Sequence, residues 1–363
     1  MKVTRQLHDL GQRIWLDNIT RELLGSGTLQ RYIREFSVTG LTSNPTIFHN
    51  AIKSSSIYDS SIRKKTLAGK SAEEIFMELA VEDLTQAADL FRPDHDATDG
   101  VDGWVSLEVS PLLANDTAGT IKAALQLHAQ VNRPNLLIKI PGTKAGLAAI
   151  EEVIFAGVPV NVTLLFSGEQ YVAAAEAYMR GIARRIDAGR DARVASVASL
   201  FISRWDVAVK DKVAEELRNR LGIAIAMRTY KAYRELLDSS RWQKLRAAGA
   251  RPQRLLWAST GTKDPAAKET LYIDALAAPD TINTIPEKTL LAFATQGEVK
   301  SVLPPDGGDA EQMLVEFSAA GVDIVALAAD LQREGTAAFA KSWDELMSLI
   351  SSKIDAFGRE KQS

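Results

Sequence analysis

The sequence predicts an α/β protein built as a closed (β/α)8 TIM barrel, with additional C-terminal helices. Eight short apolar runs, several of them rich in β-branched residues, alternate with longer stretches of helical periodicity. Polar and ionisable residues stand at the ends of several of these runs, where barrel enzymes carry their active sites. The length of 363 residues suits one large α/β domain. A doubly wound open sheet would alternate in the same way, so the number of elements alone does not decide between the two.

The predicted strands follow one another along the chain with helical stretches between most of them. Their β-branched and aliphatic content is typical of parallel strands that are buried on both faces. They are Arg13–Asn18, Val38–Ser43, Gly103–Val109, Asn135–Ile140, Val158–Thr163, Arg193–Ser199, Arg254–Ser259 and Thr281–Ile285.

Helices are predicted where apolar residues recur at helical spacing, as in Ala72–Ala88, and where charged residues and alanine dominate, as in Asp206–Leu221. Glycine and proline indicate a loop at Leu303–Asp309, and an acidic loop is expected at Pro93–Asp102. We expect a single domain over residues 1–363, in which residues 309–363 form appended helices. Two such helices are predicted, at Asp309–Ala320 and Asp330–Phe357.

Composition excludes several classes of protein. A formal net charge of -3 argues against a nucleic-acid partner, and the absence of cysteine excludes disulfides, thiolate metal sites and a cysteine nucleophile. The four histidines are scattered, so no metal site is predicted. Charged residues run through the first thirty positions, and no apolar run approaches the length of a membrane span. We therefore expect a cytoplasmic protein with no membrane partner.

Six side chains capable of hydrogen bonding or acid–base chemistry lie at predicted strand ends. In a parallel barrel these ends form one ring, so the side chains are expected to converge. They are Asp17, Asn44, Glu108, Lys139, Asn161 and Thr163.

Lys139 stands among four aliphatic residues, in Leu136-Leu137-Ile138-Lys139-Ile140. An arbitrary lysine in such a run would more often lie at a surface strand end with its ammonium group in water. A buried lysine amine is biased toward its neutral form, because desolvation disfavours the charged one. A neutral amine can attack a carbonyl to form a Schiff base, and the iminium then accepts electrons from a breaking C–C bond without a metal or cofactor.

Such chemistry also needs proton carriers, and two carboxylates are candidates. Asp17 could take the proton of the hydroxyl whose carbon leaves, and Glu108 could act through a water held by Thr163. Either carboxylate alone would more often be structural, as an ion pair or a helix cap. Two carboxylates at the ends of strands one and three, with a lysine on the next strand, favour a catalytic interpretation.

Three motifs resemble the transaldolase family. Thr42-Ser43-Asn44-Pro45-Thr46-Ile47-Phe48 resembles its signature after the second strand, and Ile138-Lys139-Ile140-Pro141-Gly142-Thr143 resembles its Schiff-base lysine segment. Val160-Asn161-Val162-Thr163-Leu164-Leu165-Phe166 resembles the strand that holds the catalytic water. The resemblance extends from about Asp17 to Lys263, and the three motifs in this order form a specific signal.

The resemblance implies a role for each matching residue. Lys139 would form the Schiff base, Asp17 would serve cleavage and addition, and Glu108 with Thr163 would manage water during dehydration. Asn44, Asn161 and Ser199 would contact the dihydroxyacetone unit. Arg204, in Ser199-Leu200-Phe201-Ile202-Ser203-Arg204, would hold the substrate phosphate.

The chain departs from the family pattern after the seventh strand. It reads Trp257-Ala258-Ser259-Thr260-Gly261-Thr262-Lys263, so Ser259 is kept but no second arginine follows it. Lys263 or backbone amides of Thr260–Thr262 would then complete the phosphate site. An exposed loop position for Lys263 is an equal alternative, and a lysine lacks the bidentate geometry of arginine.

The activity implied is transfer of a dihydroxyacetone unit from sedoheptulose 7-phosphate or fructose 6-phosphate to glyceraldehyde 3-phosphate or erythrose 4-phosphate, in the non-oxidative pentose phosphate pathway. No cofactor is expected, and the partners would be sugar phosphates. An aldolase of the fructose-6-phosphate type is the alternative, although those relatives have glutamine at position 108 and tyrosine at position 201. A catalytically inactive barrel used for binding is a third reading. The sequence does not distinguish a monomer from a homodimer.

Overall fold

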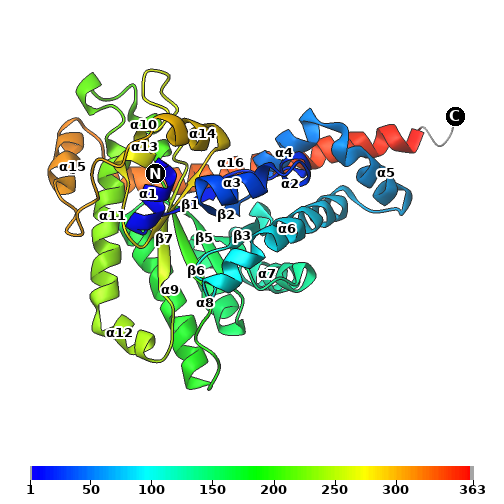
Figure 1. The fold of residues 1–363 in the computed structure, drawn as a ribbon, viewed down its shortest axis with the longest axis horizontal. Helices are drawn as coiled ribbons and strands as arrows, with labels where there is room; N and C mark the ends of the chain where they lie inside the picture. Colours follow the sequence, from blue (N-terminus) through cyan, green and yellow to red (C-terminus); the bar gives the residue numbers. More distant parts are fainter. Residues whose placement is uncertain (1, 360–363) are drawn as a thin grey trace.

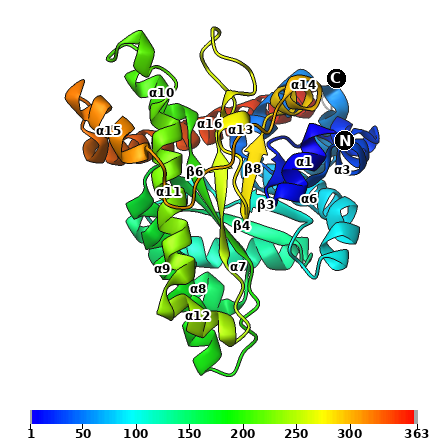
Figure 2. The same cartoon turned by 60° about the vertical axis from the view of Figure 1, so that its left-hand side comes forward.

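The computed structural model describes residues 2–359, and in it eight parallel strands close into a barrel in sequence order (Figures 1 and 2). Each strand pairs with the next, and β8 closes the ring against β1. The closed barrel is confirmed over the open sheet. The strands are β1 (Arg13–Leu16), β2 (Val38–Thr42), β3 (Trp104–Glu108), β4 (Leu136–Pro141), β5 (Val160–Leu165), β6 (Ser196–Phe201), β7 (Gln253–Ala258) and β8 (Thr281–Ile285).

All eight predicted runs overlap an observed strand. The largest differences are at β5 and β6, which begin two and three residues later than predicted and extend further toward the carboxyl end. Proline lacks a backbone N–H and cannot donate to a sheet ladder, so Pro159 precedes β5 rather than belonging to it. Every residue of β2, β4 and β5 is buried, as expected for strands enclosed by a ring of helices.

Helices fill the connections and surround the barrel. They are α1 (Val3–Leu10), α2 (Arg21–Gly25), α3 (Thr28–Phe36), α4 (Pro45–Ser54), α5 (Asp59–Leu67), α6 (Ala72–Ala97), α7 (Thr117–Val131), α8 (Lys144–Ala156), α9 (Gly168–Asp187), α10 (Ser203–Val209), α11 (Leu221–Asp238), α12 (Ser240–Ala247), α13 (Leu271–Ala275), α14 (Glu287–Gln296), α15 (Ala310–Ala319) and α16 (Ile324–Arg359).

Side-chain caps begin several helices directly after the strands. Asn44 accepts a hydrogen bond from the Ile47 backbone at the start of α4, with an N–O distance of 3.0 Å. Thr143 caps α8 and Ser167 caps α9 in the same manner. A capping side chain replaces one hydrogen bond missing at a helix start, typically contributing about 1 kcal/mol. The caps therefore fix where the chain turns back after β2, β4 and β5.

The helix predicted at Asp206–Leu221 is wrong. Within this range α10 ends at Val209, and α11 begins only at Leu221. Residues 210–220 include no buried side chain, so a continuous helix here would have no apolar face to bury. The Asp206 carboxylate instead accepts hydrogen bonds from the Leu221 and Gly222 backbone N–H groups, and this folds the segment back onto α10.

The loop predicted at Pro93–Asp102 is wrong over its first half, because α6 continues to Ala97 despite Pro93. Arg92 and Asp96 form an ion pair one helical turn apart, with an N–O distance of 2.7 Å. The His95 ring packs edge-on against Trp104, with ring centroids 5.0 Å apart. These contacts hold the last turn of α6 against the start of β3.

The C-terminal helices are confirmed in position along the chain. α15 coincides with the predicted helix at Asp309–Ala320, α16 contains the whole of Asp330–Phe357, and Leu303–Asp309 forms neither helix nor strand. α16 crosses the molecule beside α4 and α5 (Figure 1) and also contacts α6 and β5. The assignment of residues 1–363 to one domain stays a prediction. Within residues 2–359, no helix is long and apolar enough to cross a bilayer.

Large side chains fill the bore between the two ends of the barrel. Arg13, Trp15 and Asp17 alternate with Ile14 and Leu16 and therefore share the inward face at β1. The Trp15 indole lies over Gly40 of β2, where an added Cβ would approach its nitrogen to 2.7 Å. Glycine is thus required at position 40, because any side chain there would displace this plug.

Candidate active site

The staggered register of β3, β4 and β5 places three candidate site side chains next to one another. Glu108 pairs in register with Lys139, and Lys139 pairs with Asn161. Residues paired in register on parallel strands point to the same face. All three are buried, so they form a row on the inner wall of the barrel.

Lys139 is 5% exposed, and its Nζ donates hydrogen bonds to Glu108 Oε2 and to the Ser43 carbonyl, both at 3.2 Å. The ring of Phe339 from α16 lies over the same amine, with its centroid 5.3 Å from Nζ. The amine is thus buried, and Glu108, one of the two carboxylates expected near it, lies directly beside it.

One carboxylate oxygen of Glu108, Oε2, accepts a hydrogen bond from Lys139, and the other, Oε1, has no hydrogen-bond partner among the described residues. Burial raises the pKa of Glu108, the Lys139 charge lowers it, and the Asp17 charge raises it further. Its Oε1 atom and the Thr163 hydroxyl are both buried without a hydrogen-bond partner among the described residues. Buried polar atoms in a folded protein are normally paired. Each of these two atoms can therefore accept a hydrogen bond from a water or a substrate hydroxyl.

Asp17 follows β1, and its Oδ1 accepts a hydrogen bond of 2.8 Å from the Thr42 hydroxyl. Burial by the barrel wall raises the pKa of Asp17, while the charges of Lys139 and Lys263 and the bond from Thr42 lower it. A buried carboxyl with a raised pKa is suited to accept and return a proton. Asp17, Glu108 and Lys139 thus form one electrostatic cluster.

The two asparagines have different surroundings. Asn44 is half-buried and its Oδ1 caps α4, which leaves its amide N–H groups for other partners. Asn161 is fully buried: its Oδ1 accepts from the Ser199 hydroxyl at 2.7 Å, and its Nδ2 donates to Ser106 Oγ at 3.0 Å. Asn161 and Ser199 are brought together by the structure, and the hydrogen-bonded chain holds both in defined orientations.

Arg204 lies in the first turn of α10, with its guanidinium over Phe201 and Phe339 at 5.5 and 5.9 Å from the ring centroids. Desolvation lowers its pKa, and the Glu334 charge opposes this. No carboxylate forms an ion pair with Arg204 in the part of the chain that is described. A partly buried, unpaired guanidinium that lies over the same Phe339 ring as the Lys139 amine is suited to hold a phosphate.

Ser259 follows β7 in a left-handed conformation, with φ of 55° and its Oγ 2.9 Å from Ser203 Oγ. This hydrogen bond links the end of β7 to the first residue of α10, next to Arg204. Lys263 is exposed on the loop that follows, as in the alternative considered for it. Its charge nevertheless lowers the pKa of Asp17, so the loop lies on the active-site side of the barrel.

Two residues of α16 complete the site and were not predicted. Phe339 contacts both Lys139 and Arg204, and Gln332 donates to the Gly142 and Leu164 carbonyls at 3.1 and 3.0 Å. Leu164 follows Thr163 and has a φ of 60°, a strained conformation that these bonds stabilise. Gln332 and Phe339 are seven residues apart and therefore lie on the same face of α16. This spacing was the only feature of the sequence that could have indicated that the two residues contact the same region.

Comparisons with known proteins agree with the resemblance of the motifs. A model of the family described as Transaldolase/Fructose-6-phosphate aldolase matches residues 14–350. The Saccharopolyspora erythraea protein named transaldolase is 44% identical over 356 residues, which cover 96% of this chain and 97% of that protein. The transaldolase of Thermobifida fusca is 44% identical, covering 97% and 98%. That of an Arthrobacter species is 45% identical, covering 95% of each chain.

Proposed function

This chain belongs to the transaldolase family and is a transaldolase, and we propose that its reaction proceeds through a Schiff base on Lys139. The observation that carries the proposal is the buried Lys139 amine with Glu108 at 3.2 Å inside the mouth of a closed barrel. A ketose phosphate binds with its carbonyl carbon facing Nζ. The substrates proposed are fructose 6-phosphate and sedoheptulose 7-phosphate as donors, with aldose phosphates as acceptors.

Glu108 transfers protons in two steps, the activation of the Lys139 amine and the dehydration of the carbinolamine. It accepts a proton from Lys139, so that the neutral amine can attack the carbonyl carbon and form a carbinolamine. It returns a proton to the departing hydroxyl, and water leaves as the iminium forms. The raised pKa of Glu108 suits both directions of transfer. Its free Oε1 and the Thr163 hydroxyl support a position for that water.

Asp17 drives the cleavage. It removes the proton of the hydroxyl on the fourth carbon, the bond between the third and fourth carbons breaks, and its electron pair flows into the iminium. An aldose phosphate leaves and an enamine of the dihydroxyacetone unit stays on Lys139. Addition to a second aldose phosphate reverses each step, with Asp17 returning the proton to the new hydroxyl. Asn44, Asn161 and Ser199 hold the hydroxyls of the retained unit.

Transfer requires that the enamine survive until the acceptor arrives, and the surroundings of Lys139 favour this. Phe339 covers the amine, and Phe201 lies beside Arg204. These apolar faces keep bulk water from the intermediate. The shielding of the intermediate and the similarity to proteins named transaldolase both favour transfer over the aldolase alternative.

Arg204 holds the phosphate in this proposal, with Lys263 and the Ser259–Thr262 backbone completing the site. The guanidinium supplies a planar pair of donors and the lysine a mobile point charge. A cytoplasmic location remains part of the proposal.

The test is product analysis with fructose 6-phosphate in the presence and absence of erythrose 4-phosphate. With both sugars, glyceraldehyde 3-phosphate and sedoheptulose 7-phosphate should form in equal amounts. Without the acceptor, turnover should fall to a small fraction of the transfer rate. Release of free dihydroxyacetone at the full rate without acceptor would identify an aldolase instead.

A further inference from the structure

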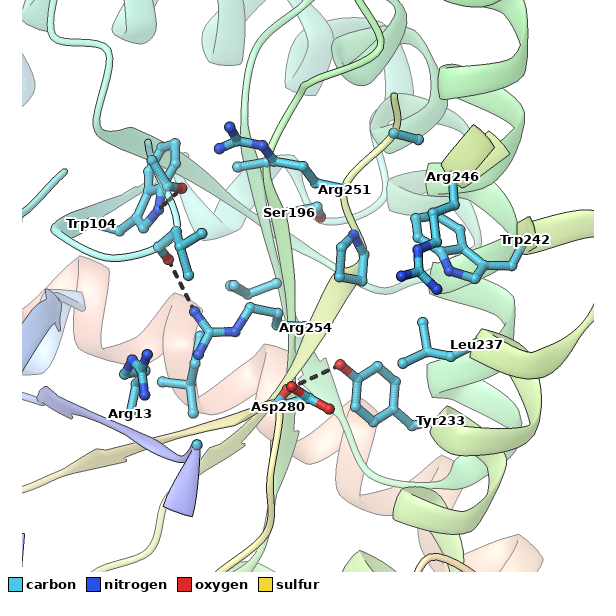
Figure 3. Close-up of a pocket in the computed structure, with 18 of the residues that line it drawn as sticks. Arg13, Trp104, Ser196, Tyr233, Leu237, Trp242, Arg246, Arg251, Arg254 and Asp280 are labelled. Atoms are coloured by element: carbon cyan, nitrogen blue, oxygen red, sulfur yellow. Dashed lines mark hydrogen bonds between the residues drawn. The ribbon is translucent and has the colours of Figure 1, made fainter. Parts of the chain in front are cut away.

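A second cavity, of about 600 Å³, enters the barrel at the amino-terminal ends of the strands (Figure 3). The active-site groups stand at the opposite, carboxyl, ends of the strands, so the two sites are separate. The volume lies within the range of small-molecule binding sites. Residues at the starts of five strands line it: Arg13, Trp104, Ser196, Arg254 and Ile282.

Trp15 lines the inner end of this cavity. It is fully buried, and its indole Nε1 has no hydrogen-bond acceptor among residues 2–359. On the inward face at β1, Trp15 lies between Arg13 on the cavity side and Asp17 on the active-site side. The cavity therefore extends into the bore and stops at the plug that Trp15 forms over Gly40.

Arg13 and Arg254 share one carboxylate inside the cavity wall. Arg13 Nε lies 2.7 Å from Asp102 Oδ2, and Arg254 Nη1 lies 3.5 Å from Asp102 Oδ1. The side chains are 19%, 15% and 4% exposed for Arg13, Arg254 and Asp102. Burial lowers the pKa of Arg254, with the Asp102 charge opposing it. Two guanidinium groups held by a single buried carboxylate leave a positive charge without a counterion.

Donors also remain free on both arginines. Arg13 uses Nε and Nη1, and Arg254 uses Nη1 and Nη2, in their hydrogen bonds to Asp102 and backbone carbonyls. Arg13 Nη2 and Arg254 Nε make no hydrogen bond to the residues described. A guanidinium carries five N–H donors, so each group can bind a further acceptor.

Helix α12 supplies the other side of the cavity, where Arg246 lies beside Trp242 (Figure 3). Arg246 is exposed and forms no ion pair within residues 2–359, whereas Arg251 and Arg234 are paired with Asp99 and Asp280. The lining residues contain five arginines and three aspartates, and Asp102 behind them adds a fourth acid. Cationic charge thus exceeds anionic charge.

We propose that this cavity binds a small phosphorylated molecule, with its phosphate between Arg13 and Arg254 and its body against the indole of Trp242. Guanidinium groups match the geometry of phosphate oxygens and bind them through charge-assisted hydrogen bonds. Trp242 is 3% exposed and lines the cavity, so the accessible part of its indole offers apolar contact to the body of the ligand. Arg246 adds a third cation, exposed to solvent, that attracts the anion.

The experiment titrates glycerol 3-phosphate into the Arg204→Ala variant, so that the phosphate position of the active site is removed. The probe has no carbonyl and cannot form a Schiff base. Binding is followed by calorimetry and by tryptophan fluorescence, since Trp15, Trp104 and Trp242 line the cavity. One equivalent should bind saturably, and glycerol, which lacks the phosphate, should not bind.

Two further substitutions in this background locate the site. Arg254→Gln and Arg246→Gln should each weaken binding, by roughly tenfold or more for Arg254, since hydrogen bonds between charged groups contribute about 1.5–3 kcal/mol. Arg246 is exposed, so its variant should fold even if Arg254→Gln does not. Arg241→Gln on the same helix, where Arg241 pairs with Glu176, is the matched control and should leave affinity unchanged. Absence of saturable binding, or equal affinity in the Arg246 variant and the control, overturns the proposal.

Discussion

The reactive lysine is defined by the acid beside it as much as by its burial. A lone buried ammonium would be costly, and a lysine in an aliphatic run would normally extend to water. Here Glu108 lies 3.2 Å from the Lys139 amine, and burial raises the pKa of its carboxyl, which suits it to exchange a proton with that amine. Asp17 adds to this by raising the pKa of Glu108. The three groups are therefore electrostatically coupled, and in the proposed mechanism they act together.

Substitution of Glu108 by glutamine tests this coupling. Glu108→Gln should lower kcat by about 100-fold or more, the usual range for loss of a general acid–base group. In the wild type, the acid limb of the kcat/KM profile should lie above the usual range for glutamate, because the pKa of Glu108 is raised and its carboxylate form is needed to receive the lysine proton. In the Glu108→Gln variant, the acid limb of the kcat/KM profile should become less steep, because the ionisation of Glu108 no longer contributes to it.

Glu169→Gln, at an exposed position on α9, is the matched control and should leave the rate and the profile unchanged. A Glu108→Gln enzyme with wild-type turnover would remove Glu108 from the mechanism.

Phe339 provides a second test at single-residue scale. Phe339→Ala should expose the enamine to water, so the ratio of dihydroxyacetone release to transfer should rise while the Schiff base still forms. The ratio is measured from products of fructose 6-phosphate with limiting acceptor. Phe357→Ala on the same helix, where Phe357 packs against Arg63, is the control. An unchanged ratio in Phe339→Ala would mean that Phe339 does not shield the intermediate.

At the scale of elements, the sequence predicted what depends on local pattern and failed where a distant partner decides. The eight strands were predictable because buried parallel strands are short apolar runs bounded by polar residues. The path between α10 and α11 was not, since it depends on Asp206 reaching the backbone of Leu221 and Gly222. Likewise, α16 was predicted as a helix, but its position over Lys139 depends on packing that no local pattern reveals.

The buried carboxylate of Asp206 makes a prediction about stability and pH. Burial raises its pKa to about 6 from an ordinary value of 3.8, against hydrogen bonds from Tyr272 and two backbone N–H groups that lower it. The folded state therefore binds the proton more tightly than the unfolded state. Its contribution to stability is greatest below the unfolded pKa and falls as pH rises from about 3.8 to about 6.

Asp206→Asn should remove this dependence. Relative to wild type, the free energy of unfolding of the variant should rise by up to roughly 3 kcal/mol between the acid and neutral ends of that window. Urea unfolding at several pH values measures it. Asp211→Asn, exposed in the same segment, should follow wild type. A constant difference between Asp206→Asn and wild type across the window would contradict the raised pKa.

At the scale of the whole molecule, the barrel uses its two ends differently. The carboxyl ends of the strands gather Lys139, Glu108 and Asp17, and the amino ends carry the arginine-rich cavity. Convergence of the strand-end residues could be predicted because a closed parallel barrel places all strand ends in one ring. The contacts of α16 with the site and the arginine-rich cavity could not, because they arise from loops and helices whose placement is set by tertiary contacts.

Mass spectrometry after borohydride reduction with fructose 6-phosphate tests the central claim most directly. The wild-type enzyme should gain one reduced dihydroxyacetone unit on the peptide that contains Lys139. Lys144→Met, an exposed neighbour at the start of α8, should label equally, and Lys139→Met should not label. A label on another lysine, or a labelled Lys139→Met enzyme, would contradict a Schiff base on the buried amine.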